Sequence, residues 1–300
     1  VFVSFTVSTL PDRAPLANEP AATRSVSRRA WLSLAATGAL AACASPVPLA
    51  QDGAEESPGD EPTSAYRASE EELAALNASA WARASSLAVL GEPPGRWFHQ
   101  TFPSYRHTDF TPLAAHAGRP ALRALAHKSN SLIRHQLNWP SVRLGGLRLG
   151  FSWLGTALNP GADVGERGHD DAIARVVLTF DGDRSGFTAR DHLVSELAHL
   201  LTGTPLPNAT LMYVWDTRHP VGTVVDSPAS RRIRYLVVDS GSDKLGRWAD
   251  HERDIARDFR TVFGESPGEL LDVGLMCDSN NTGAAVESYF GPVRLSVSAS

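Results

Sequence analysis

The amino-acid sequence predicts a mainly β fold, an antiparallel β-sandwich with two or three short helices. Apolar and polar residues alternate with a period of two in residues 147–153, 175–180 and 211–216, which is typical of strands with one buried face. Clusters of Gly, Pro, Asn and Asp separate many such runs, and this favours an antiparallel sandwich over a parallel sheet wound with helices. The 300 residues, 42% of them hydrophobic, suffice for one full-sized core.

The other elements follow from the same patterns. Further strand-like runs cover residues 97–102, 121–127, 132–137, 233–239, 270–276 and 286–297. Two helices interrupt the strands. One is expected after a cap at Thr188, where leucines follow helical spacing, and the other over residues 255–263, which end before Gly264.

The chain is predicted to have four parts. Ser69 and Glu72 form a predicted capping box at the start of a helix. The segment before it is rich in Pro, Gly, Ser, Asp and Glu, a composition that cannot bury enough apolar surface to offset ordering. The parts are a signal peptide (residues 1–42), an acidic disordered tether (43–68), a helix (69–90) and the β-sandwich domain (95–300).

The amino-terminal part has the order of features found in bacterial export signals. Arg28 and Arg29 precede an apolar run over residues 32–42, which is too short to span a bilayer of about 30 Å. The arginine pair resembles a twin-arginine signal, and the residues before Cys43 resemble a lipobox. We therefore expect Cys43 to be lipidated, although it would be a buried Cys if the segment were an ordinary helix. Ala44 favours sorting to the outer membrane in a Gram-negative host.

Charge makes nucleic acid an unexpected partner. The formal net charge is −5, and the acidic excess lies between residues 44 and 72. The chain after Glu72 is close to neutral. It lacks the basic footprint that neutralises a phosphate backbone. The lipid anchor is the only membrane contact we expect.

Several motifs occur in an order that carries a family resemblance. They read DDAIARVVLTFD, TLMYVWDTRHPVGTVV, KLGRWADHERDIARDFRTVFGESP and VGLMCDSNNTGAAVESYFGPVRL. Over residues 95–297 the chain resembles the bacterial family catalogued as domain of unknown function 3047. That family is similar to the jelly-roll, galactose-binding-like sandwiches used by carbohydrate-binding modules. The resemblance implies a fold and no activity.

Candidate ligand-binding residues lie on the predicted strands. Asp171 and Arg175 stand at the start of one strand, where they form either part of a polar site or a structural ion pair. Trp153 and Trp215 are candidate platforms for sugar rings, which present apolar faces to indole. Both also fall in phase with the apolar face of their strand, so core filling is the alternative.

A polar segment, CDSNNTG, separates the last strand-like runs. Asp278 and Asn281 are its candidate ligand-facing residues. Asp, Asn and Gly also have turn chemistry of their own, so a structured turn is the favoured interpretation. Cys277 precedes the segment among apolar neighbours, which is typical of an inert buried thiol.

Two patterns imitate metal sites without completing one. Residues 181–186 open like a calcium loop, but His192 stands where the final carboxylate belongs, so a strand-ending turn is favoured. His192, Glu196 and His199 share one helical stripe, which lies roughly 120° from the leucine stripe and should face water. We predict neither a metal nor a cofactor.

The sequence therefore predicts an exported, lipid-anchored protein on the periplasmic side of a bacterial envelope, whose sandwich binds a polar ligand, with a carbohydrate as the favoured class. One alternative is a polysaccharide hydrolase or lyase that uses Asp171, Glu252 and Asp278 as acid/base groups. Another is a structural envelope protein without a small ligand. The chain has no G-x-S-x-G, Walker or H-E-x-x-H motif, so no catalytic residue is assigned.

Overall fold

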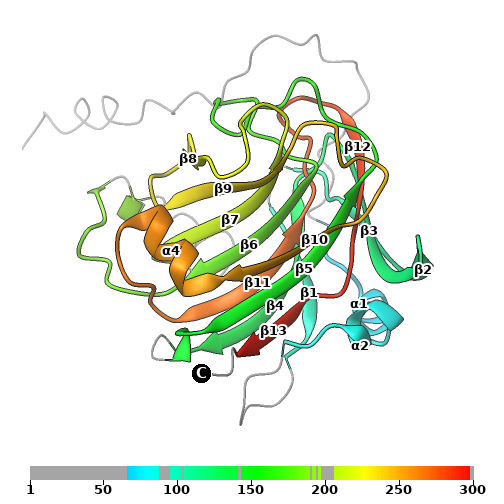
Figure 1. Ribbon diagram of the computed structural model, residues 1–300, viewed down its shortest axis with the longest axis horizontal. Helices are drawn as coiled ribbons and strands as arrows, with labels where there is room; N and C mark the ends of the chain where they lie inside the picture. The colour runs from blue at the N-terminus through cyan, green and yellow to red at the C-terminus, as the bar shows by residue number, and fades with distance from the viewer. Residues whose placement is uncertain are drawn as a thin grey trace, which may run out of the picture. The chain divides into compact units, whose positions relative to one another are not determined.

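Two curled β-sheets, packed face to face, form the body of the described chain (Figure 1). The computed structural model describes residues 66–87, 95–102, 105–140, 143–189, 191–193, 195–196 and 206–297. The predicted signal residues Arg28 and Arg29, the lipidation site Cys43 and most of the predicted tether lie outside these ranges. No helix within them is long and apolar enough to cross a membrane.

The first sheet has seven strands. In spatial order they are β1 (Trp97–Thr101), β4 (Ser131–Trp139), β11 (Leu270–Met276), β6 (Ala174–Phe180), β7 (Ala209–Asp216), β9 (Ile233–Ser240) and β8 (Val224–Asp226). Neighbouring strands are antiparallel except β7 and β9, which run parallel. This parallel pair is the one departure from a wholly antiparallel sheet, and the loop that contains β8 connects its two strands.

The second sheet has six strands. Its path is β10 (Ala249–Asp254), β5 (Leu147–Gly155), β12 (Ala285–Phe290), β3 (Arg119–His127) and β2 (Asp109–His116), and β13 (Arg294–Val297) also pairs with β5. The mainly β sandwich predicted from the sequence is confirmed. The strands that the period-two pattern did not reveal are β2, β8 and β10, which lie at sheet edges and alternate less clearly because an edge strand is less buried.

The space between the sheets forms the main core. Its largest fully buried side chains include Trp81, Trp153, Trp215, Tyr213 and Phe259. They come from both sheets and from two helices, so inward-facing residues of the predicted strands meet as the period-two pattern requires.

The helix predicted over residues 69–90 is instead two shorter helices within the described residues, α1 (Glu70–Asn77) and α2 (Ala80–Ala84). The predicted capping box of Ser69 and Glu72 is present. The break occurs because Ser79 adopts an extended conformation and its side chain caps α2, accepting a hydrogen bond from the Ala82 N–H. A serine that offers a cap competes with continuation of the helix.

The predicted helix before Gly264 is present as α4 (Ile255–Phe263). Asp254 caps its first turn, and Gly264 ends it in the left-handed conformation, with φ of 75°. Because α4 follows β10 directly, it stands at the edge of the second sheet (Figure 1). The helix predicted after Thr188 is described only in part, at residues 191–193 and 195–196.

Candidate functional site

The polar segment after β11 is a structured turn that is hydrogen-bonded to a second loop, the one that precedes β6. The Asp171 carboxylate accepts hydrogen bonds from the Thr282 N–H and hydroxyl, both at 2.7 Å, and from the Asn281 N–H at 3.2 Å. The Asn281 side chain donates to Asp170 at 2.6 Å. Gly283, with φ of 70°, closes the turn. The structure thus brings Asp171 and Asn281 together, as parts of one loop-to-loop clamp.

Asp278 and Arg175 form a buried ion pair beside this clamp. Their charged atoms are 3.0 Å apart, and both side chains are almost fully buried. Asp278 also accepts the Ala172 N–H, and the guanidinium of Arg175 lies over the Tyr235 ring. Burial is the largest single effect and lowers the pKa of Arg175, but the charges of Asp278 and Asp170 and the contact with Tyr235 together outweigh it and raise the pKa above its usual value. Arg175 therefore stays charged and committed to its partner.

Two of the predicted acid/base residues, Asp171 and Asp278, lie close enough for their charges to interact, and the third lies elsewhere. Asp171 and Asp278 have their acceptor oxygens occupied by donors from their own surroundings. Glu252 stands on β10 in the other sheet, where it pairs in register with Gly150. The structure does not bring Asp171, Asp278 and Glu252 together as groups that could flank one glycosidic bond.

Trp153 and Trp215 belong to the core, so neither can be a surface platform for a sugar. Their relative exposures are 0% and 1%. Trp153 donates its indole N–H to Asp239, and Trp215 donates to the Gly241 carbonyl. Trp215 and Arg175 also face opposite sides of the first sheet, because Arg175 is in register with Val214.

The structure describes the first metal-like pattern in full and the second in part. Asp183 accepts hydrogen bonds from the N–H and hydroxyl of Ser185, which makes a strand-ending turn. His192 and Glu196 are exposed, and His199 lies outside the described residues. Among the residues that the structure describes, no three His, Cys, Asp or Glu side chains are grouped to hold a metal ion.

Cys277 is fully buried. Burial, followed by the Asp278 charge, raises the pKa of its thiol well above the usual value. A thiol that stays protonated is a poor nucleophile, so Cys277 is a core residue in this structure.

A charged groove of about 380 Å³ opens where β10 and α4 face β9. Its volume falls within the range of small-molecule sites. The lining side chains come from the ends of β5 and β10, the loop before β8, β9 and the first turns of α4. They are Arg148, Gly222, Leu236, Glu252, Arg253, Asp254, Arg257, Asp258 and Thr261. Of these, sequence reasoning singled out only Glu252.

Arg253 and Asp258 line the inner wall of the groove, and the buried Tyr213 behind them completes a polar triad. Arg253 donates to both carboxylate oxygens of Asp258 at 2.8 Å, and the Tyr213 hydroxyl donates to the same carboxylate at 2.9 Å. Burial, then the Asp258 charge, raises the pKa of Tyr213 well above its usual value, so its hydroxyl remains a donor. The three side chains come from β7, β10 and α4, so this wall exists only in the folded protein.

The outer wall of the groove carries further charges of both signs. Asp254 accepts the Arg257 N–H at 2.9 Å as the cap of α4, and lies 4.0 Å from Arg148. The Arg257 side chain is exposed. The lining arginines and the lining carboxylates are equal in number. The groove therefore presents donors and acceptors and carries no net formal charge.

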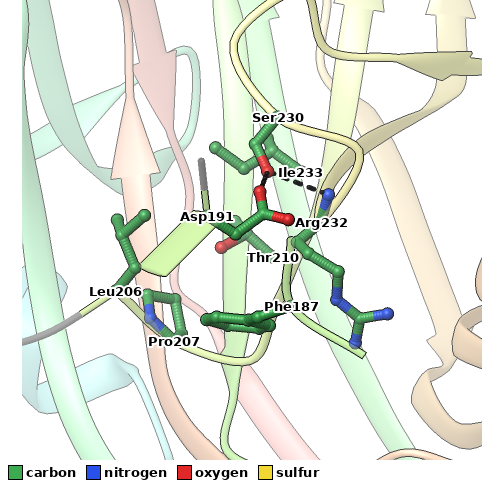
Figure 2. A pocket seen from close by; sticks show the side chains of 8 residues that line it. All are labelled: Phe187, Asp191, Leu206, Pro207, Thr210, Ser230, Arg232 and Ile233. Atoms are coloured by element: carbon green, nitrogen blue, oxygen red, sulfur yellow. Dashed lines mark hydrogen bonds between the residues drawn. The ribbon is translucent and has the colours of Figure 1, made fainter. Parts of the chain in front are cut away.

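A second cavity is too small for an organic ligand. It has about 20 Å³ of space between the loops beside β7 and β9 (Figure 2), enough for about one water molecule. Figure 2 shows the side chains of Phe187, Pro207 and Leu206 along one side and the Ser230 hydroxyl bonded to Asp191, at 3.2 Å, on the other. We therefore take the groove as the candidate site.

Comparison with solved structures finds only distant similarity. The xyloglucanase domain of NopAA from Sinorhizobium fredii, solved with cellobiose, is 9% identical, with a TM-score of 0.36 over 69% of this chain and 96% of that one. Endoglucanase 3 of family GH12 from Trichoderma harzianum is 10% identical, with a TM-score of 0.32 over 71% and 89%. SGBP-B, from a xyloglucan utilization locus of Bacteroides uniformis, is 11% identical, with a TM-score of 0.27 over 69% and 46%. These likenesses concern the β-sandwich fold alone.

Comparison at the level of sequence identifies a family. No curated protein matches the chain. A family model described as "Protein of unknown function (DUF3047)" matches residues 95–294, which include both sheets almost completely and all the groove residues. The chain therefore belongs to the DUF3047 family.

Proposed function

We propose that the protein is a binding protein whose groove beside β10 and α4 holds a neutral, hydroxyl-rich ligand, with a saccharide as the class. The observation that carries the proposal is the balanced set of guanidinium and carboxylate groups around one groove of ligand size. A strongly cationic ligand would be repelled by the lining arginines, and a strongly anionic ligand would be repelled by the equally numerous carboxylates.

The chemistry of the walls suits sugar hydroxyls. Each hydroxyl is both a donor and an acceptor, so a ring with neighbouring hydroxyls is best held where donors and acceptors alternate. Arg253 and Asp258 are already fixed by each other and by Tyr213, so little side-chain entropy is lost when they bind. Arg257 and Glu252, both exposed on the rim, supply one further donor and one further acceptor.

Binding fits the groove better than hydrolysis does. Glycoside hydrolysis needs two carboxyl groups on either side of the bond. Asp258 is held by Arg253 and Tyr213, and Asp254 is the helix cap, so Glu252 is the one groove carboxylate not engaged in such a contact in the described residues.

A glycan array of neutral saccharides, probed with the purified full-length chain, tests the proposal. We expect binding that Arg257→Ala weakens by about tenfold, the loss of a charge-assisted hydrogen bond. Arg260→Ala is the matched control, because Arg260 lies on the same helix but does not line the groove, and it should bind like the wild type. No bound saccharide, or equal binding by both variants, would show the proposal to be wrong.

We further propose that this binding domain acts at the bacterial envelope, carried there by export and held by a lipid on Cys43. The support is the order of Arg28, Arg29, the apolar run and Cys43 in the sequence. Mass spectrometry of the mature protein should find an acylated Cys43 as its first residue. An unmodified chain that begins before Arg28 would contradict it.

A further inference from the structure

Trp248 differs from the other tryptophans in the described part of the chain. Five of them are buried, namely Trp81, Trp97, Trp139, Trp153 and Trp215. Trp248 is half-buried, one residue before β10, and packs beside Leu154 and Tyr289 on the outer face of the second sheet. An indole that keeps part of its ring in solvent is the surface that can stack on a sugar.

The Trp248 ring is held in place from several sides. Its N–H donates to the Ala117 carbonyl at 3.2 Å, and the Arg119 guanidinium lies 4.8 Å from the ring centre. Arg119 also pairs with Asp250 at 2.6 Å and donates to Ser152 at 3.2 Å. The ring therefore stands next to a polar group of fixed geometry, an arrangement that offers stacking and hydrogen bonds together.

The face that carries Trp248 continues into the groove. Ala249, His251 and Arg253 of β10 point into the sandwich, because the first is part of the core, the second bonds to Asp239 and the third bonds to Asp258. By alternation, Trp248, Asp250 and Glu252 share the outer face. Asp250 confirms this through its contact with Arg119.

Glu252 joins this face to the groove, since it is one of the lining residues. The residue opposite Glu252 on β5 is Gly150, where an added Cβ would meet nothing closer than 3.8 Å. Glu252 therefore has no side chain opposite it on β5, and the nearest neighbour of that position is Arg294 of β13, at van der Waals distance. Four residues of strand separate Trp248 from Glu252, about 13 Å at roughly 3.3 Å per residue, which exceeds the length of one sugar ring.

We propose that the ligand is a saccharide chain of more than one ring, which lies along the outer face of β10 with one ring stacked on Trp248 and another in the groove. This inference rests on the proposed function and extends it from a single sugar to an oligosaccharide. Asp250 and Arg119 lie between Trp248 and the groove and hydrogen-bond the intervening hydroxyls, and Glu252 does so at the groove end.

Calorimetry with neutral oligosaccharides of one to six units tests the inference, using gluco-, xylo-, manno- and galacto-configured series and the full-length chain. For a series that binds, affinity should rise with chain length. Trp248→Ala should lower the affinity for the long members about tenfold and leave that for the shortest binding member unchanged. Trp248→Phe should restore most of the loss, because an aromatic ring still stacks.

The outcomes separate this inference from the function on which it rests. If Arg257→Ala weakens long members but Trp248→Ala does not, the groove binds saccharide and the inference is wrong. If no member of any series binds the wild type, both are wrong. Thermal unfolding of Trp248→Ala guards against misfolding, and if that variant does not fold, the comparison of Trp248→Phe with Trp248→Leu decides, since the two have similar bulk but only Phe stacks.

Discussion

At the scale of single residues, Arg175 and Asp278 form an ion pair in which both side chains are buried. Arg175→Met should destabilise the protein by about 3–5 kcal/mol, because it leaves the buried Asp278 charge without a partner. Adding Asp278→Leu to it should recover much of the loss. Urea unfolding measures both.

The half-exposed pair of Arg184 and Asp181, 3.4 Å apart, provides the matched control. Arg184→Met should cost less than about 1 kcal/mol, since exposed ion pairs contribute little. Equal losses for Arg184→Met and Arg175→Met would show that burial does not set the strength of the Arg175 pair.

Cys277 allows a chemical test of burial. Its raised pKa and full burial predict that a maleimide will not label it in the native state. In a Cys43→Ser variant, where Cys277 is the only cysteine, we expect no labelling in buffer and complete labelling in guanidinium chloride. Rapid labelling of the folded variant at pH 7 would contradict the placement of Cys277 in the core.

At the scale of elements, a bulge in β9 decides what faces the core. The register between β7 and β9 shifts between Val214 and Trp215, so Asp239 rather than Val238 pairs with Trp215. The buried Asp239 then accepts hydrogen bonds from Trp153 at 2.6 Å and bonds to His251 at 2.7 Å. The extra residue in β9 thus turns the Asp239 carboxylate toward the space between the sheets.

The cap of α4 sets the position of the groove wall. Asp254→Ala removes the acceptor of the Arg257 N–H and should cost about 1 kcal/mol in the free energy of unfolding. Asp254→Asn should remain within a few tenths of wild type, because Asn caps as well as Asp. Chemical denaturation distinguishes them, and an equal loss in both variants would assign the effect to charge instead of capping.

At the scale of the whole molecule, His99 links stability to pH. Burial, then the charge of His107, lowers the pKa of His99 to about 4. In the unfolded chain the pKa is about 6.5, so between these values the unfolded state binds more protons. The contribution of neutral His99 is therefore complete above pH 6.5 and lost as the pH falls toward 4.

Urea unfolding across this window should show stability falling by up to about 3 kcal/mol through His99. In His99→Gln the fall between pH 6.5 and 4 should be smaller by that amount, because Gln does not titrate. His192→Gln is the control, since His192 is exposed, and should follow the wild-type curve. Parallel curves for His99→Gln and wild type would contradict the lowered pKa.

Local patterns in the sequence are sufficient for much of the fold. Some features depend only on a few neighbouring residues, and the structure contains them. They are the strand runs, the Ser69 capping box, and α4 with its end at Gly264. The sequence does not predict the break at Ser79, because a serine within a helical pattern can either continue one helix or cap the next.

The candidate site was less accessible to sequence reasoning. Of the groove residues only Glu252 is a candidate from the sequence, since Arg253 and Asp258 look like ordinary surface charges until the strands are placed. Trp153 and Trp215 were candidates because they lie on strands, and Trp248 was missed because it lies just before one. A period of two assigns a side chain to a face, but not the exposure of that face.

The sequence by itself determined the β class, the positions of most strands and of α4, and membership of a family, because these depend on periodicity and short motifs. Tertiary structure alone decided that Asp171 binds Thr282 and that Arg253 and Tyr213 both donate to Asp258. It also decided that five of the tryptophans in the described residues are buried while Trp248 is half-buried. The physical reason is that hydrogen bonds and burial act between residues close in space. Folding brings together residues that lie 45 and 111 positions apart along the chain, as in Tyr213 with Asp258 and Asp171 with Thr282.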